Sequence, residues 1–138
     1  MEQRDYLERQ IDQIGLVLRA IVSKLMGMQI GSIATQGVEE ANEKLVQELD
    51  IDFNTILLYP EDQVIDSLIQ EKGFNFNNLE KLLEAFALIA DDMDESDERR
   101  LLLYRRCVVI GAYLEENSQS VSFDRYLKME RFRKIIKV

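Results

Sequence analysis

A dense run of carboxylates between residues 91 and 98 is the strongest candidate for chemistry in this sequence. Carboxylate oxygens are the ligands that Mg²⁺ and Ca²⁺ prefer, and side chains on helices can supply them. The candidate metal ligands are Asp91, Asp92, Asp94 and Glu95. This cluster is the basis of an alternative hypothesis for function, a divalent-metal-dependent all-α protein that binds or hydrolyses nucleotides.

The same acids also fit a second interpretation, a solvated loop that joins two helices. An EF-hand loop that starts at Asp92 needs glycine at its sixth position and glutamate at its twelfth. The sequence has Asp97 and Leu103 there, so the EF-hand pattern is absent. The acids at the end of the run would then stabilise the N-terminus of the following helix through its dipole.

Residue types that perform most acid–base and nucleophilic catalysis are missing or isolated. The chain has no histidine, the commonest general base and the commonest zinc ligand. The single cysteine, Cys107, lies in an apolar run without a histidine to activate it, so we expect a core residue. The sequence therefore predicts no catalytic residue and no cofactor.

Charge is unevenly distributed along the chain. The net charge of −9 and the pI of about 4.6 argue against binding to nucleic acid or to a membrane surface. Residues 121–138 are the exception, with six cations and two acids, so this segment is net +4 and the remainder −13. We expect this basic segment to dock within the chain beside acidic helices and to bury its apolar residues. These residues are Phe123, Tyr126, Leu127, Met129, Phe132 and Ile136.

Three features bear on cellular location. The opening residues 1–5 carry charges of both signs, whereas a secretory signal needs a basic start and an apolar run. No stretch reaches the roughly 18 apolar residues that cross a bilayer. A single cysteine cannot form an internal disulfide, which fits a reducing compartment. We therefore expect a cytoplasmic protein.

The clearest element is a long amphipathic helix over residues 6–28. Its apolar residues alternate spacings of four and three, and Val17 and Val22 widen the stripe. The stripe consists of Leu7, Ile11, Ile14, Leu18, Ile21, Leu25 and Met28. Two interpretations compete, a core helix of a globular bundle and the seam of a coiled-coil dimer, and the wide stripe favours the bundle. The oligomeric state, monomer or homodimer, stays open.

Turn and cap residues divide the remaining chain into further helices. We expect helices over residues 38–49, 60–72, 77–93 and 101–114, a last helix after residue 122, and a helical turn within 50–59. Asn77 and Ser122 are predicted N-caps, and Lys72-Gly73 is a predicted stop. The helix over 101–114 is apolar nearly all round and should be the most buried. Predicted core residues are Leu18, Leu83, Phe86, Val108 and Ile110.

Parts of the chain resemble known helical families. Residues 38–49 resemble the second helix of a tetratricopeptide repeat, with a small residue followed by leucines. Residues 5–11 and 102–125 resemble a small bacterial family of all-helical, tetratricopeptide-like proteins of unknown function. The second stretch includes the turn at Glu115-Glu116-Asn117 and the helix start at Ser122-Phe123-Asp124-Arg125. The resemblance implies a right-handed superhelix or a compact helical bundle, with no site residues to carry over.

These observations together predict one all-α domain over residues 1–138, built from antiparallel helical hairpins. The main hypothesis for function is a non-catalytic protein–protein interaction or scaffold domain whose partner is another protein. It depends on the helical hairpins, the lack of a catalytic constellation and the contrast between the acidic body and the basic C-terminal segment. The alternative is the metal-dependent nucleotide protein that uses the acids at 91–98.

Calorimetric titration with Mg²⁺, Mn²⁺ and Ca²⁺ separates the two hypotheses. The interaction-domain hypothesis predicts no micromolar binding of these ions. The metal hypothesis predicts micromolar binding that disappears when Asp91→Asn is combined with Asp92→Asn, because the ion loses two of its carboxylate ligands. Binding that survives this double substitution would contradict the assignment of the acidic stretch as the site.

Overall fold

The chain folds as an all-α protein, as the sequence predicts. The computed structural model describes the backbone of residues 2–28, 34–119 and 121–137, and the side chains of residues 9–26, 39–119 and 121–137. Within these residues it has seven α-helices and no strand, with 84% of the chain helical. The ends of the predicted first stripe, Leu7 and Met28, lie outside the described side chains.

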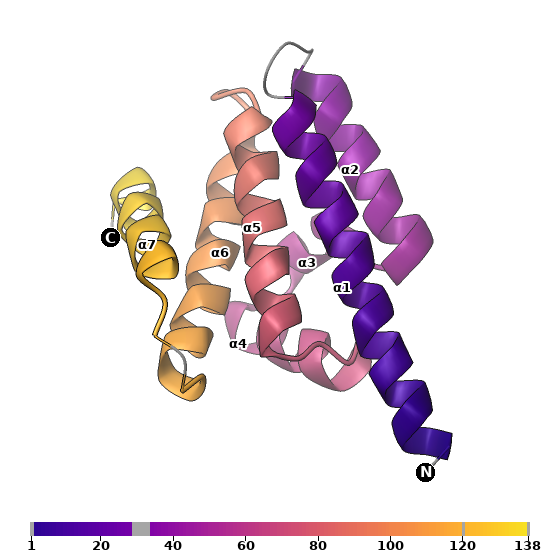
Figure 1. Ribbon diagram of the computed structural model, residues 1–138. Coiled ribbons are helices and arrows are strands. Elements are labelled where there is room, and N and C mark those ends of the chain that lie inside the picture. The colour runs from indigo at the N-terminus through magenta and orange to yellow at the C-terminus, as the bar shows by residue number, and fades with distance from the viewer. Residues whose placement is uncertain (1, 29–33, 120, 138) are drawn as a thin grey trace.

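Five helices stand side by side in the order α2, α1, α5, α6 and α7 (Figure 1). Their bounds are Glu2–Met28 for α1, Ala34–Leu49 for α2, Phe76–Asp92 for α5, Glu98–Asn117 for α6 and Phe123–Ile136 for α7. Helix α5 contacts α1, α2 and α6, and α6 contacts α7 on its other side. Helix α7 therefore lies at one edge of the molecule, with the pair α1 and α2 at the other.

Two short helices, α3 (Phe53–Leu58) and α4 (Glu61–Asp66), complete the fold and contact α6. Helix α4 continues as a π-helix over Ser67–Glu71, so the predicted helix over 60–72 changes its hydrogen-bonding pattern halfway. The predicted stop is confirmed, because Lys72 is the C-cap and Gly73 adopts a positive φ of 73°. A left-handed residue of this kind ends helices, and glycine adopts it without a steric penalty.

A buried arginine joins α6 to the corner between α3 and α4. Arg106 is 6% exposed. Its Nη2 atom donates hydrogen bonds to the carbonyl oxygens of Leu57 at 3.0 Å and Tyr59 at 3.1 Å. Its Nη1 atom lies 3.3 Å from Oε1 of Glu61, the first residue of α4. A cation beside the free carbonyls of a helix C-terminus is favourable, so Arg106 stabilises the end of α3 and the turn after it.

Helix α5 is the most buried element, and the prediction that the helix over 101–114 would be so is wrong. Nine of the 17 residues of α5 are buried, against seven of the 20 in α6. Leu101 and Leu102 of α6 are 46% and 37% exposed. Helix α5 is covered by α1, α2 and α6, whereas part of the first turn of α6, with Leu101 and Leu102, faces solvent.

Four of the five predicted core residues are buried, namely Leu18, Leu83, Phe86 and Ile110. The fifth, Val108, is only half-buried and packs at the margin of the core. Cys107 is a core residue, as predicted, and its Sγ lies 3.6 Å from the carbonyl oxygen of Leu83. Burial raises the pKa of the Cys107 thiol, which therefore stays protonated.

One of the two predicted N-caps is confirmed, and the other is wrong. Ser122 caps α7, since its side chain accepts a hydrogen bond from the backbone nitrogen of Arg125 at 3.0 Å. Helix α5 begins at Phe76, and its cap is Asn75 rather than Asn77; the Asn75 side chain accepts from the backbone nitrogen of Asn78 at 2.8 Å. Asn78, in the first turn of α5, is buried, and its amide nitrogen donates a hydrogen bond to the carbonyl oxygen of Ile11 on α1.

The central position of α5 is tested by truncating Leu83, which is 1% exposed. Leu83→Ala should lower the free energy of unfolding by about 2–5 kcal/mol, because the enclosing helices cannot fill the cavity. The matched control is Leu58→Ala, which removes the same atoms from a side chain that is 84% exposed. Chemical denaturation followed by circular dichroism measures both. Equal stability of the two variants would contradict the described core.

Candidate functional site

The structure gives Asp91, the first predicted metal ligand, two partners from neighbouring helices. Its Oδ1 and Oδ2 atoms lie 2.9 Å and 3.3 Å from the two terminal nitrogens of Arg131 on α7. The hydroxyl group of Tyr104 on α6 donates a hydrogen bond to the same carboxylate. Asp91 thus links the C-terminal end of α5 to α6 and α7.

The remaining acids of the stretch lie at the end of α5, in the turn that follows and at the start of α6. Asp94 accepts hydrogen bonds from the backbone nitrogen and the hydroxyl of Ser96, which lower the pKa of Asp94. Asp97 caps α6 by accepting from the backbone nitrogen of Arg99 at 3.0 Å. Asp92 ends α5 and is half-buried, and Glu95 is exposed. Within the described part of the chain, no three His, Cys, Asp or Glu side chains gather to hold a metal ion.

The basic C-terminal segment docks on acids within the chain, as the charge pattern predicts. Three ion pairs link α7 to α5 and α6: Arg125–Glu80, Arg131–Asp91 and Arg133–Glu115. Arg125 is 4% exposed and the side chain of Glu80 34%, so the cation of this pair is buried, whereas the Arg133 pair spans 3.8 Å at the surface. A pair of this kind fixes the position of the helix, because breaking it leaves a buried cation without compensation.

Two fully buried apolar side chains complete the contact between α7 and α6. The ring of Phe132 packs against that of Tyr104, with 5.7 Å between their centroids. Met129 lies against Gly111, where α6 has no side chain to keep the two helices apart. Burial and the hydrogen bond to Asp91 raise the pKa of Tyr104 to about 12. The inner face of α7 is therefore fixed by both packing and charge.

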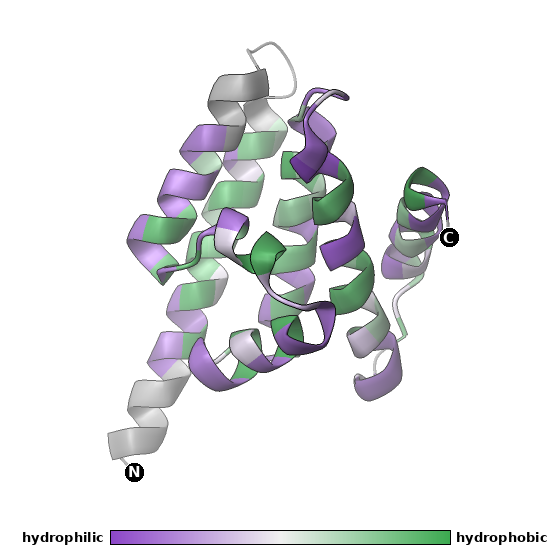
Figure 2. Cartoon of the chain, turned by 180° about the vertical axis from the view of Figure 1, so that it is seen from behind, coloured by the Kyte–Doolittle hydropathy of each residue, from purple (hydrophilic) through white to green (hydrophobic). Residues whose placement is uncertain are grey.

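The opposite side of α7 remains uncovered, and the prediction that all its apolar residues pack inside is wrong. Three side chains of the helix, Phe123 (72% exposed), Tyr126 (52%) and Leu127 (52%), form what we call the α7 outer face, and Val121 (98%) precedes the helix. The rings of Phe123 and Tyr126 stack with 6.4 Å between centroids and 16° between planes. Figure 2 shows hydrophobic segments of α7 at the edge of the molecule. One neighbouring helix can cover only one stripe of α7.

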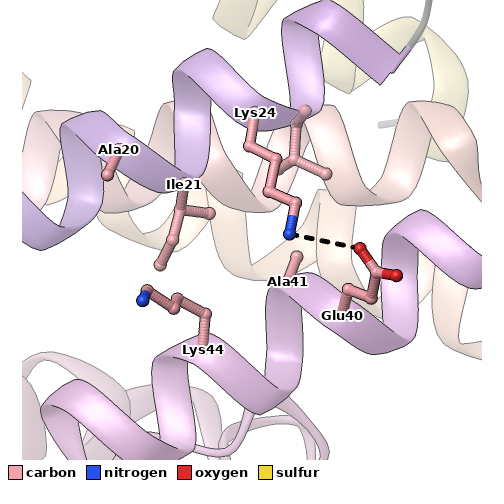
Figure 3. A pocket seen from close by; sticks show the side chains of 7 residues that line it. Ala20, Ile21, Lys24, Glu40, Ala41 and Lys44 are labelled. Atoms are coloured by element: carbon pink, nitrogen blue, oxygen red, sulfur yellow. Dashed lines mark ion pairs between the residues drawn. The ribbon is translucent and has the colours of Figure 1, made fainter.

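A second surface feature is a groove of about 260 Å³ between α1 and α2 (Figure 3). Ile21 and Ala41 line it with apolar atoms, and Lys24 spans it to reach Oε2 of Glu40 at 3.2 Å. Figure 3 places the amino group of Lys44 near Ile21, on the other side of the groove. The groove carries cations and an acid together, so its charge does not favour one class of ligand.

Comparison with known proteins gives no relative from which a function could be inferred, so the function has to be argued from the structure. No protein-family model, curated protein or solved structure matches this chain. Among the described helices, none is long and apolar enough to cross a membrane. The resemblance to tetratricopeptide-like proteins stays a prediction.

The close contact between α6 and α7 is tested at Gly111. A Cβ atom added there would lie 2.9 Å from Cε of the buried Met129 and closer still to its Sδ. Gly111→Ala should destabilise the protein by about 1–3 kcal/mol through overpacking, although alanine in a free helix stabilises by about 0.5–1 kcal/mol. Thermal unfolding measures the change. Met129→Ala should cost less stability in the Gly111→Ala background than in wild type, because there it also relieves the overpacking, and a stabilising Gly111→Ala would contradict the docking.

Proposed function

We propose that the chain is a non-catalytic protein-interaction domain, cytoplasmic in location, that binds through the α7 outer face. The observation that carries this proposal is the exposure of two stacked aromatic rings and a leucine on a helix whose other face is already buried. Phe123, Tyr126 and Leu127 follow the spacing i, i+3 and i+4, which places them together on one side of the helix.

Physical arguments support a binding role for such a face. Contiguous exposed apolar residues are uncommon on proteins that act alone, and they mark contact sites. Aromatic side chains supply large contact area with little conformational entropy to lose, and they dominate binding energy at many interfaces. Leu58 is a single exposed apolar side chain on α3, whose other apolar residues are buried, and isolated exposed residues of this kind are normal on protein surfaces.

The docked inner face of α7 supports the proposal in a second way. Met129, Phe132 and the ion pairs of Arg125 and Arg131 hold the helix against α5 and α6 before any partner arrives. A surface that is ordered in advance loses less entropy on binding than a flexible one. Helical arrays of the tetratricopeptide kind bind partners on surfaces made by stacked helices, and the resemblance in residues 38–49 is consistent with that use.

Site-specific photo-crosslinking in cells tests the proposal. A photoreactive phenylalanine analogue is placed at Phe123 in one variant and at Leu58 in the control, since both side chains are more than 70% exposed. We expect a discrete protein adduct from position 123 and none from position 58. Adding Leu127→Ser to the first variant should abolish the adduct, because the apolar face is then interrupted.

Three outcomes would contradict the proposed function. They are no adduct at position 123, equal adducts at both positions, or an adduct that persists with Leu127→Ser. Circular dichroism spectra and melting curves of each variant show whether the fold is kept. The surface position of Leu127, which is 52% exposed, makes a folded variant the expected result.

A further inference from the structure

We propose that a pocket between α1 and the start of α5 binds a small organic phosphate. The two helices lie side by side (Figure 1). The pocket has a volume of about 350 Å³, which is enough for a small ligand. None of its lining residues belongs to α7, so this site is separate from the α7 outer face and goes beyond the proposed function.

The observation that carries this inference is the amino group of Lys81, a half-buried residue of α5 that lines the pocket. Every other buried or half-buried cation in the described part of the chain contacts an acid or an aromatic ring. These cations are Lys72, Arg99, Arg100, Arg106, Arg125, Lys128 and Arg133. Lys81 contacts neither among the described residues. Because a cation that has lost part of its water favours an anion beside it, Lys81 indicates a negatively charged ligand.

Further donors line the same pocket. Arg19 approaches from α1 and, like Lys81, forms no ion pair with a described residue. The side chains of Asn75 and Asn77 line the pocket beside the start of α5. Asn75 uses its Oδ1 atom to cap the helix, which leaves its amide nitrogen for a ligand. Guanidinium, ammonium and amide groups are the donors that hold phosphate oxygens in proteins, and here two helices supply them to one space.

The rest of the lining defines the ligand further. Asp12 is the one acid of the pocket, so the lining has a net charge of +1 in a chain whose net charge is −9. Asp12 lies seven residues before Arg19, about 10 Å along the axis of α1, and forms no ion pair with either cation. The phosphate group therefore belongs at the end that holds Arg19 and Lys81. Leu16, which is 59% exposed, offers apolar surface to the carbon part of the ligand.

Titration of the full chain with phenyl phosphate, followed by NMR, tests the inference. Saturable shifts should appear at the backbone amides around Arg19 and Lys81. Arg19→Gln combined with Lys81→Gln should weaken binding by roughly tenfold or more, because two charged donors are lost. The matched control, Arg105→Gln combined with Lys134→Gln, makes the same change of charge at exposed positions of α6 and α7 and should bind as wild type. Asp12→Asn should strengthen binding, because the pocket then lacks its one acid.

The inference is overturned if wild type shows no saturable shifts at these amides, or if sodium chloride at equal ionic strength produces the same shifts. It is also overturned if the pocket variant binds as tightly as the control, or if Asp12→Asn weakens binding. Melting curves show whether each variant is folded. Should the double substitution unfold the chain, Arg19→Gln alone, at an exposed position, must still weaken binding relative to Arg105→Gln alone.

Discussion

The arrangement of the helices depends on one buried charge, the guanidinium of Arg106. A buried cation is costly unless its donors are satisfied, and the ends of α3 and α4 supply the carbonyl oxygens and the carboxylate that it needs. This requirement fixes where α3 stops, how the chain turns at Pro60 and which side of α6 the two short helices cover. Helix α7 packs on another part of α6, where Met129 lies against Gly111 and Phe132 against Tyr104.

The helices themselves were predictable because their patterns are local. Apolar spacing indicated α1 and α5, and the Gly73 stop and the Ser122 cap are read from neighbouring residues. The errors arose where tertiary neighbours decide. Asn75 and Asn77 can both cap a helix, and composition alone does not choose between them. Arg106 was missed because its partners lie about 50 residues away along the chain.

The candidate site was only partly predictable for a related reason. The charge contrast correctly indicated that cations of α7 meet acids within the chain, and Asp91 became such a partner instead of standing free in an acidic loop. The exposed aromatic pair was missed because every apolar residue of the last helix was assigned to one buried face. The sequence does carry a signal, since Met129 and Phe132 share one stripe of the helix whereas Phe123 and Leu127 share another.

The lone thiol of Cys107 has a consequence for how motions of this protein can be followed. It is completely enclosed in the interior, and only a thiolate reacts readily with alkylating reagents. Reaction therefore requires that the segment around it opens to solvent, and the labelling rate counts those openings under native conditions. Because the sequence has no other cysteine, the kinetics report on a single location without any engineered probe. Slow alkylation would indicate that this part opens only with global unfolding, and fast alkylation would reveal a local opening of the edge helices.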